Sequence, residues 1–471
     1  MSLAHQAARG ALWTMVSSMS GRLVGVLGTL VMTRFLAPDV IGEVSDATIL
    51  CMTANWLSIW GFGQYAVVNA RGEHARAIAW HATVGYVALG VVALGVVAAF
   101  GGRLTPLLDA PHAAIYVPGM ALALFVRRLG VMPERMLIQQ MNFRASGLAL
   151  ALGEIAYTAT ALAFAMRGVG GMAIVYGNLV QSVVVVAIFV RAAGVRSWAT
   201  PSRLSWTRIR EMLRFGLPLG VQGVAHNASR YWDNLTVSHF FGPGATGAYN
   251  MAYNLADIPA IQIGEQIALV LLPSMSKLAP ERRPAALERA TALLSLVIFP
   301  LAVGLGLVAR PLIAAILPAN AWQEVAPLLT VLACLSVFRP ITWVLSAYFE
   351  AERKTNRLMG LEIAKVIAML VGFALLAPFG LRVAATAVGI AFGGSAVAGV
   401  WLVAREPNGP SVARLFAGFA RPLIACAAMA AAVWALSQML AGAHPLVELE
   451  QIARGAAQAS RSVSARSAAP F

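Results

Sequence analysis

Charged residues are scarce in this 471-residue chain. Asp, Glu, Lys and Arg make up 12% of it, whereas apolar types make up 59%. A globular domain in water carries about 25% charged residues, so this composition excludes an ordinary soluble protein. A membrane-spanning helix needs about 20 consecutive apolar residues. Several stretches carry no charge over that length, namely 77–102, 168–190, 290–309, 383–404 and 422–447.

Other absences exclude several kinds of chemistry. The three cysteines, Cys51, Cys334 and Cys426, lie far apart within apolar segments, so we expect neither a disulfide nor a metal site. The chain has no Gly-x-x-x-x-Gly-Lys phosphate loop, which argues against ATP hydrolysis. No polar segment is long enough for a catalytic domain. We therefore expect no enzyme activity and no cofactor.

Apolar segments of membrane-spanning length recur along the whole chain and predict an all-α polytopic membrane protein. We expect thirteen helices, over 11–33, 44–67, 79–101, 113–133, 145–166, 169–190, 212–236, 246–274, 288–309, 323–348, 358–377, 381–404 and 415–441.

The chain has a net charge of +15, and its basic residues are distributed along the sequence as expected for a membrane protein. With a cytoplasmic N-terminus, most basic residues fall in inside loops, including the cluster Arg127, Arg128, Arg135 and Arg144. The outside loops hold Arg103, Arg167, Arg310 and Arg382. This asymmetry is the positive-inside pattern, with some attraction to anionic membrane lipids. It argues against nucleic-acid binding as the use of the charge.

One line of the sequence occurs twice. Residues 33–43, TRFLAPDVIGE, return 205 positions later as residues 238–248, SHFFGPGATGA. The shared pattern Phe-x-x-Pro-x-x-x-Gly joins one apolar segment to the next, and we interpret it as a turn between helices. Because six helices separate the copies, the two halves are parallel repeats about an axis along the membrane normal, with a central cavity between them.

The repeat predicts the domain organisation. We expect an N-lobe over 1–191, a basic cytoplasmic linker over 192–211 and a C-lobe over 212–404. An additional helix follows over 405–441, and then a polar tail over 442–471.

Several motifs resemble the polysaccharide transporters, the lipid-linked oligosaccharide flippases of the multidrug/oligosaccharidyl-lipid/polysaccharide exporter superfamily. The motifs are Arg9-Gly10-x-x-Trp13, Arg34 to Gly42, Arg230-Tyr231-Trp232-Asp233-Asn234-Leu235, Phe240-Phe241-Gly242-Pro243, Gly247 to Tyr253, Ile258-Pro259 and Leu272 to Ser276. Such proteins have twelve or fourteen helices, and the polar tail stands where a fourteenth would lie. The resemblance implies an undecaprenyl-diphosphate-type substrate and a functional link to glycan polymerase and glycosyltransferases.

Cationic residues within predicted spans are candidates for binding the diphosphate, because burying a charge in hydrocarbon is costly and arginine binds phosphate oxygens in pairs. They are Arg22, Arg34, Arg230, Arg339 and Lys365. Structural roles are the alternative. Arg230 can pair with Asp233, and Lys365 with Glu362, both at i,i+3 spacing. Arg34 can reach the interface, and Arg339 can satisfy carbonyls freed by Pro340.

Acidic residues within predicted spans form a second group of candidates, for coupling or gating. They are Asp46, Glu154, Asp233, Asp257 and Glu265. They can bind a proton or sodium, or form salt bridges that open as the lobes rock. The simpler alternative is permanent pairing with the cations.

The sequence therefore predicts a flippase of the bacterial inner membrane that works by alternating access in surface polysaccharide biosynthesis. An ion-coupled multidrug antiporter of the same superfamily is the alternative, and it would need an anionic cavity. A polytopic enzyme of glycan assembly is the second alternative.

Overall fold

The computed structural model describes residues 21, 24–69, 75–140, 142–259, 271, 274–275, 278–318, 321–352, 354–406 and 409–439. The described part is helical, with short 3-10 turns and no strand. The chain divides into two compact units, Met1–Gly247 and Ala248–Phe471.

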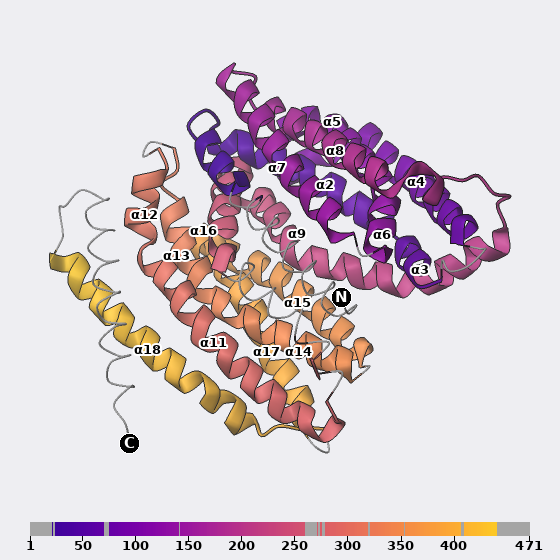
Figure 1. Ribbon diagram of the computed structural model, residues 1–471. Coiled ribbons are helices and arrows are strands. Elements are labelled where there is room, and N and C mark those ends of the chain that lie inside the picture. Colours follow the sequence, from indigo (N-terminus) through magenta and orange to yellow (C-terminus); the bar gives the residue numbers. More distant parts are fainter. Residues whose placement is uncertain are drawn as a thin grey trace. The chain divides into compact units, whose positions relative to one another are not determined.

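The first unit is a helical bundle (Figure 1). Residues 24–32 are helical and precede the numbered helices. These are α2 (Pro38–Leu57), α3 (Phe62–Asn69), α4 (Ala75–Phe100), α5 (Val117–Leu129), α6 (Val131–Gln139), α7 (Phe143–Met166), α8 (Met172–Ala193) and the first part of α9 (Trp206–Pro259).

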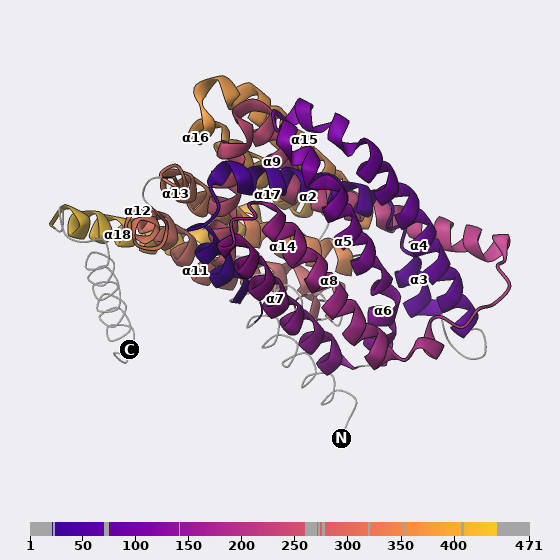
Figure 2. The ribbon, with the colours of Figure 1, turned by 90° about the horizontal axis from the view of Figure 1, so that it is seen from above.

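Helices α4, α5, α8 and α7 lie side by side in that order, as Figures 1 and 2 both show. Small residues bring the first helix against α7. A Cβ on Gly21 would meet Ala151, one on Gly25 would meet Glu154, and one on Gly28 would meet Thr158. This glycine stripe is the kind of surface that lets membrane helices approach closely.

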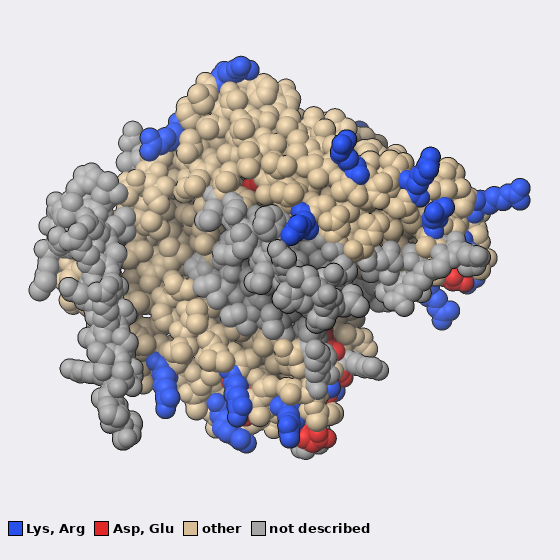
Figure 3. All heavy atoms as spheres, in the orientation of Figure 1, with Lys and Arg blue, Asp and Glu red and all other residues tan. Residues whose placement is uncertain are grey.

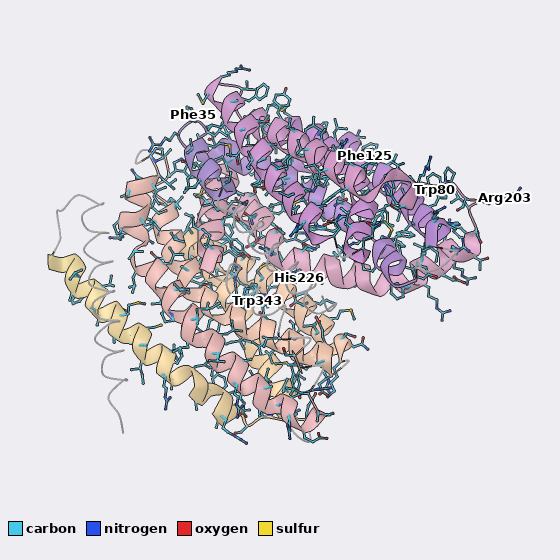
Figure 4. All side chains as sticks on the ribbon, viewed as in Figure 1. Phe35, Trp80, Phe125, Arg203, His226 and Trp343 are labelled. Atoms are coloured by element: carbon cyan, nitrogen blue, oxygen red, sulfur yellow. The ribbon has the colours of Figure 1, made fainter. Side chains whose placement is uncertain are left out.

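The segment before α9 is anchored to α4. His81 is fully buried, and its Nε2 accepts a hydrogen bond from the Ser205 amide at 2.9 Å while its Nδ1 faces the Ala77 carbonyl at 2.6 Å. Figure 4 shows Trp80 and Arg203 at this same end of the unit. Helix α9 begins at Trp206, so it starts within the segment that we expected to be a linker.

In the described residues, the second unit holds the end of α9 and eight further numbered helices. These are α11 (Arg283–Leu307), α12 (Ala309–Ile316), α13 (Val325–Leu335), α14 (Arg339–Ala351), α15 (Thr355–Leu376), α16 (Leu381–Ala384), α17 (Thr386–Ala404) and α18 (Val412–Met439). Helix α11 packs on α13, α14 and α18, and α15 packs on α17.

Three loops of the second unit meet at one end of it. Glu352, after α14, accepts from Arg283 at the start of α11 at 2.7 Å. Glu406, after α17, contacts Lys354 at 2.7 Å and Arg357 at 2.8 Å. In Figure 3, blue and red atoms lie together at the lower edge of the view, near the start of α11. The helices therefore alternate in direction within this unit, as the charge pattern predicts.

Eight helices in the described part of the chain are long and apolar enough to cross a membrane. Their outward side chains are apolar, with Leu293 67% exposed and Ile424 69% exposed. Such surfaces are stable in lipid and costly in water, so the chain is a multi-pass membrane protein. The expected total of thirteen helices stays a prediction.

Some predicted helices are interrupted. The segment expected as one helix over 44–67 breaks at 58–61 between α2 and α3, and 323–348 breaks at Ser336–Phe338 between α13 and α14. Within α9, Gly242 has a non-helical backbone (φ 78°, ψ 174°). Composition alone did not mark the breaks at 58–61 and at Ser336–Phe338, because the apolar character continues through them, whereas Gly242 lies between the predicted helices 212–236 and 246–274.

Candidate functional site: buried charges in the helical units

Four charged side chains, each at most 12% exposed, form two ion pairs in the second unit. Arg339 forms an ion pair with Asp257, and Lys365 forms one with Glu362 at 2.7 Å. Lys365 is 5% exposed and Asp257 is 4% exposed. We call these four residues the charged cluster. Two cations and two carboxylates balance, which lowers the otherwise large cost of placing charge among apolar helices.

Aromatic rings hold both cations of the charged cluster. The Arg339 guanidinium lies 4.8 Å from the Tyr253 ring centre and 5.0 Å from that of Phe392. The Lys365 ammonium lies 4.6 Å from the same Phe392 ring. Cation–π contacts of this kind stabilise a desolvated cation by about 2 kcal/mol. Phe392 therefore places the two cations side by side.

The break between α13 and α14 positions Arg339. The chain leaves α13 at Leu335, turns once as a 3-10 helix over Ser336–Phe338, and starts α14 at Arg339 with Pro340 in its first turn. Proline suits the first turn of a helix because no amide hydrogen is needed there. Arg339 thus projects from a helix start and finds a carboxylate partner, rather than serving freed carbonyls.

The two copies of the repeated line contact each other within the first unit. A Cβ on Gly42 would come within 1.8 Å of the Pro243 carbonyl oxygen, and one on Gly247 would come within 1.8 Å of the Pro38 carbonyl oxygen. Each glycine thus lies on the proline of the other copy, which is the reciprocal contact expected of two related elements. We call it the reciprocal glycine contact.

The glycines of the repeat were misread as turn residues. Pro38 does start α2 after a turn, but Gly42 lies inside that helix and has ordinary helical geometry. Its lack of a side chain serves close approach of two backbones. The turn interpretation is therefore correct for the proline and wrong for the glycine.

A buried acid lies beside the reciprocal glycine contact. Asp46 is fully buried in α2, and its Oδ2 lies 2.5 Å from the Ser238 hydroxyl of α9. That hydroxyl also lies 2.8 Å from the Leu108 carbonyl. One hydroxyl proton cannot be donated to two acceptors. Both contacts are hydrogen bonds when the Asp46 carboxyl carries a proton and donates it to Ser238.

A buried arginine that the sequence analysis assigned to a loop holds the break between α2 and α3. Arg128 is 3% exposed. It donates to Asn55 Oδ1 at 2.6 Å, to the Ser58 hydroxyl and carbonyl at 2.8 and 2.7 Å, and to the Tyr86 carbonyl at 2.6 Å. All of these acceptors are neutral. The guanidinium therefore replaces the helical hydrogen bonds that α2 loses where it ends.

A second close backbone contact lies at this break. A Cβ on Gly216 of α9 would come within 1.7 Å of the Trp60 carbonyl oxygen, and Gly61 faces Gly216 in turn. Gly61 has φ +64°, a conformation that favours glycine. Helix α9 therefore approaches the α2–α3 segment closely at two places, near Gly216 and near Gly247.

The remaining predicted site residues are dispersed. Arg34 is exposed at the end of the first helix. Glu154 in α7 accepts from Gln181 at 2.8 Å, and Asp233 is buried and accepts from the Asn234 amide at 2.9 Å. Arg230 lies over the Tyr231 ring at 5.8 Å. Arg22 and Glu265 lie outside the described residues.

The structure brings together Arg339, Lys365 and Asp257 from the predicted set and adds Glu362, Tyr253 and Phe392. Phe392 gave no distinctive signal in the sequence, whereas Tyr253 ends the motif Gly247 to Tyr253. The signal for Arg128 was its place inside the apolar segment predicted as a helix over 113–133, where a charge is costly and needs hydrogen-bond partners.

Membrane-length helices with paired charges buried among them have the construction of a polytopic membrane transporter. The family described as "Polysaccharide biosynthesis protein" matches residues 31–327, well over half of the chain. The chain belongs to this family.

Curated relatives agree with that assignment. The chain is 20% identical over 345 residues to the lipopolysaccharide biosynthesis protein WzxC of Escherichia coli (strain K12), covering 72% of this chain and 69% of the relative. It is 24% identical over 310 residues to the succinoglycan biosynthesis transport protein ExoT of Rhizobium meliloti (strain 1021), covering 64% and 60%. Similarity to the teichuronic acid biosynthesis protein TuaB of Bacillus subtilis (strain 168) is 25% over 232 residues, covering 47% and 46%.

Solved structures show the fold. The lipid II flippase MurJ in an inward closed conformation has a TM-score of 0.77 at 13% identity, covering 96% of this chain and 99% of MurJ. A multidrug resistance MATE family transporter in an inward-facing conformation has a TM-score of 0.62 at 15% identity, covering 88% and 98%. The chain thus has the helical fold of these solved structures, and its family and relatives, one of them named as a transport protein, indicate a transporter rather than an enzyme.

Proposed function

We propose that this protein is a flippase that moves a lipid-linked oligosaccharide of the undecaprenyl-diphosphate type across the bacterial inner membrane by alternating access. Family membership and relatives named for lipopolysaccharide, succinoglycan and teichuronic acid biosynthesis support this. The charged cluster is the observation that connects the proposed function with particular residues. It offers two adjacent cations, Arg339 and Lys365, at membrane depth.

The chemistry proposed for the charged cluster is an exchange of anions. Without substrate, Asp257 and Glu362 neutralise Arg339 and Lys365. A diphosphate carries enough oxygens to replace both carboxylates, and a guanidinium binds phosphate oxygens in pairs. Each cation then has an anionic partner before and after binding. This avoids the cost of an unpaired buried charge in either state.

The same proposal gives roles to the remaining predicted site residues. Arg22, Arg230 and Arg34 would contact the diphosphate or glycan along its path, and Asp46, Asp233, Glu154 and Glu265 would serve coupling or gating. The N-terminus would be cytoplasmic, as the basic loops indicate. The lipid tail would stay in the bilayer, and polymerase and glycosyltransferases would act with the flippase in surface polysaccharide biosynthesis.

Translocation by the purified protein in proteoliposomes tests the role of the charged cluster, with a fluorescent undecaprenyl-diphosphate oligosaccharide as substrate. Arg339→Ala should reduce the rate about tenfold or more, the effect of losing about 1.4 kcal/mol of binding. Arg339→Lys should retain part of the activity because the charge remains. Arg414→Ala is the control, since that side chain is 73% exposed and its nearest carboxylate is 3.8 Å away. Wild-type rates in Arg339→Ala would refute the assignment.

A multidrug antiporter is the second candidate, favoured by the fold shared with MATE transporters. Drug resistance and glycan surface display, measured separately in cells, distinguish the two functions. In Arg22→Ala and Arg230→Ala variants, the flippase hypothesis expects impaired display and unchanged resistance. Impaired resistance with normal display would support the antiporter.

A further inference from the structure

A pocket of 440 Å³ lies at the end of the second unit opposite the Arg283–Glu352 and Glu406 contacts. Helix α12, the segment leading into α13, and α16 form its walls. Its lining includes Arg310, Leu317, Trp322, Glu324, Pro327 and Arg382. We call it the end pocket. It involves none of the residues of the charged cluster.

Two arginines of the end pocket stand out in the charge distribution. The predicted outside loops contain four basic residues, Arg103, Arg167, Arg310 and Arg382, and two of these line this one pocket. The positive-inside pattern depletes arginine from such loops. Two arginines retained together around one cavity therefore point to a ligand.

The pocket arginines are available to an anion. Arg310 is exposed and has no ion pair or hydrogen bond within the described part of the chain. Arg382 donates to both carboxylate oxygens of Glu324, but the bonds are long, at 3.2–3.3 Å. The two side chains are 59% and 55% exposed, so water and salt screen the pair and reduce its contribution to the free energy. Two arginines against one glutamate leave the pocket with net positive charge. An incoming anion can displace Glu324 at small cost.

The surroundings place the end pocket at the level of lipid headgroups. On the chain segment that leads to Arg382, Leu375 is 68% exposed and Phe379 is 71% exposed. Such large exposed apolar side chains at the end of a membrane helix lie in lipid. Trp322 is 1% exposed and forms part of the wall. Phe379 precedes Arg382 by three residues, so the lipid-facing surface begins close to Arg382 along the chain.

We propose that the end pocket binds the phosphate ester of a lipid headgroup through Arg310 and Arg382. Guanidinium groups bind phosphate oxygens in pairs, and anionic headgroups are recognised by basic pockets between membrane helices. The lipid is either the diphosphate lipid that the proposed flippase releases or an anionic phospholipid of the membrane. Both present the same phosphate chemistry to the two arginines. The binding itself does not depend on transport.

Binding to the full-length protein in nanodiscs of neutral lipid tests the proposal. The probes are short-chain phosphatidylglycerol, undecaprenyl diphosphate and inorganic phosphate, with binding followed by native mass spectrometry. Arg310→Gln and Arg382→Gln should each weaken binding of a lipid probe severalfold, and the double variant about tenfold or more. Glu324→Gln should strengthen it, because the competing carboxylate is lost. Arg167→Gln, which alters another outside arginine, should leave it unchanged.

The outcomes are distinct. Weakening for phosphatidylglycerol alone identifies a membrane phospholipid as the ligand, and weakening for undecaprenyl diphosphate alone identifies the transported lipid. Unchanged affinity for both lipids in the double variant, or binding of inorganic phosphate only, would overturn the proposal. If the double variant does not fold, the opposite changes expected of Arg310→Gln and Glu324→Gln decide the matter. Arg339→Ala should not alter this binding, so failure here leaves the flippase proposal intact.

Discussion

Asp46 and Ser238 are 192 residues apart in the sequence, yet their side chains lie within 2.5 Å of each other. The contact joins α2 to α9 next to the place where the two copies of the repeated line meet. Because Ser238 also faces the Leu108 carbonyl, the geometry is that of a chain of hydrogen bonds running from Asp46 through Ser238 to the backbone.

An asparagine at position 46 should preserve this chain, since its amide can donate to Ser238 and carries no charge. We expect Asp46→Asn to keep the free energy of unfolding within about 0.5 kcal/mol. Asp46→Leu should cost about 1 kcal/mol, because the hydrogen bond is lost. Thermal unfolding in detergent measures both. Equal destabilisation by the two substitutions would show that the negative charge itself is needed.

Gly42→Ala and Gly247→Ala should each destabilise the protein by about 1–3 kcal/mol, the usual cost of overpacking. The added methyl would overlap a proline carbonyl oxygen in both cases. Gly244→Ala is the matched control, because a Cβ there meets nothing within 4 Å. Thermal unfolding of the three variants should separate the first two from the third. A neutral Gly42→Ala would show that the two backbones part easily.

Arg128→Met should destabilise the first unit by about 3 kcal/mol or more, because it leaves several buried acceptors without donors. Arg128→Lys should recover only part of this, since one ammonium cannot reproduce the planar set of donors. Arg76→Met, which alters an exposed arginine near the start of α4, is the control. The midpoint of thermal unfolding is the readout, and an unchanged midpoint in Arg128→Met would contradict the role at the α2–α3 break.

Glu406→Gln should destabilise the second unit by about 1–3 kcal/mol, because Arg357 and Lys354 both lose the Glu406 carboxylate and Lys354 keeps only Glu352 at 3.7 Å. The Glu406 side chain is 8% exposed, so salt screens its contacts weakly. Glu288→Gln removes only a contact of 3.8 Å to an exposed arginine and should change stability by less than about 0.5 kcal/mol. Thermal unfolding of both variants at low and high salt tests these expectations. Equal decreases in the free energy of unfolding for Glu406→Gln and Glu288→Gln would argue against a special role for Glu406.

The sequence predicted the positions of the long helices well, but it did not predict which charged side chains form ion pairs between helices. Runs without charge identify the long helices, because only an apolar surface is stable in lipid. The ion-pair partner of Arg339 could not be predicted from the sequence. Asp257 lies 82 residues earlier, and only the packing of the helices brings its carboxylate to Arg339. The pair Lys365 and Glu362 was within reach, because the i,i+3 spacing already places both on one helix face.

Arg128 shows where reasoning from charge fails. An arginine next to another arginine at the end of an apolar segment fits a cytoplasmic loop, and the positive-inside pattern assigned it there. Arg128 is nevertheless buried in the structure. Its guanidinium donates to unpaired carbonyls at a helix break, and these acceptors replace the water or carboxylate that an arginine otherwise needs. Those carbonyls could be located only after the break between α2 and α3 was known.

The reciprocal glycine contact also has a consequence for genetics. The obstacle to a larger residue at Gly42 or Gly247 is a main-chain oxygen, and every amino acid carries that atom. A bulky substitution at either glycine should therefore have no suppressor mutation at the residue it touches. Compensating mutations would have to shift a whole helix, and they should map along α2 and α9 rather than at Pro38 or Pro243.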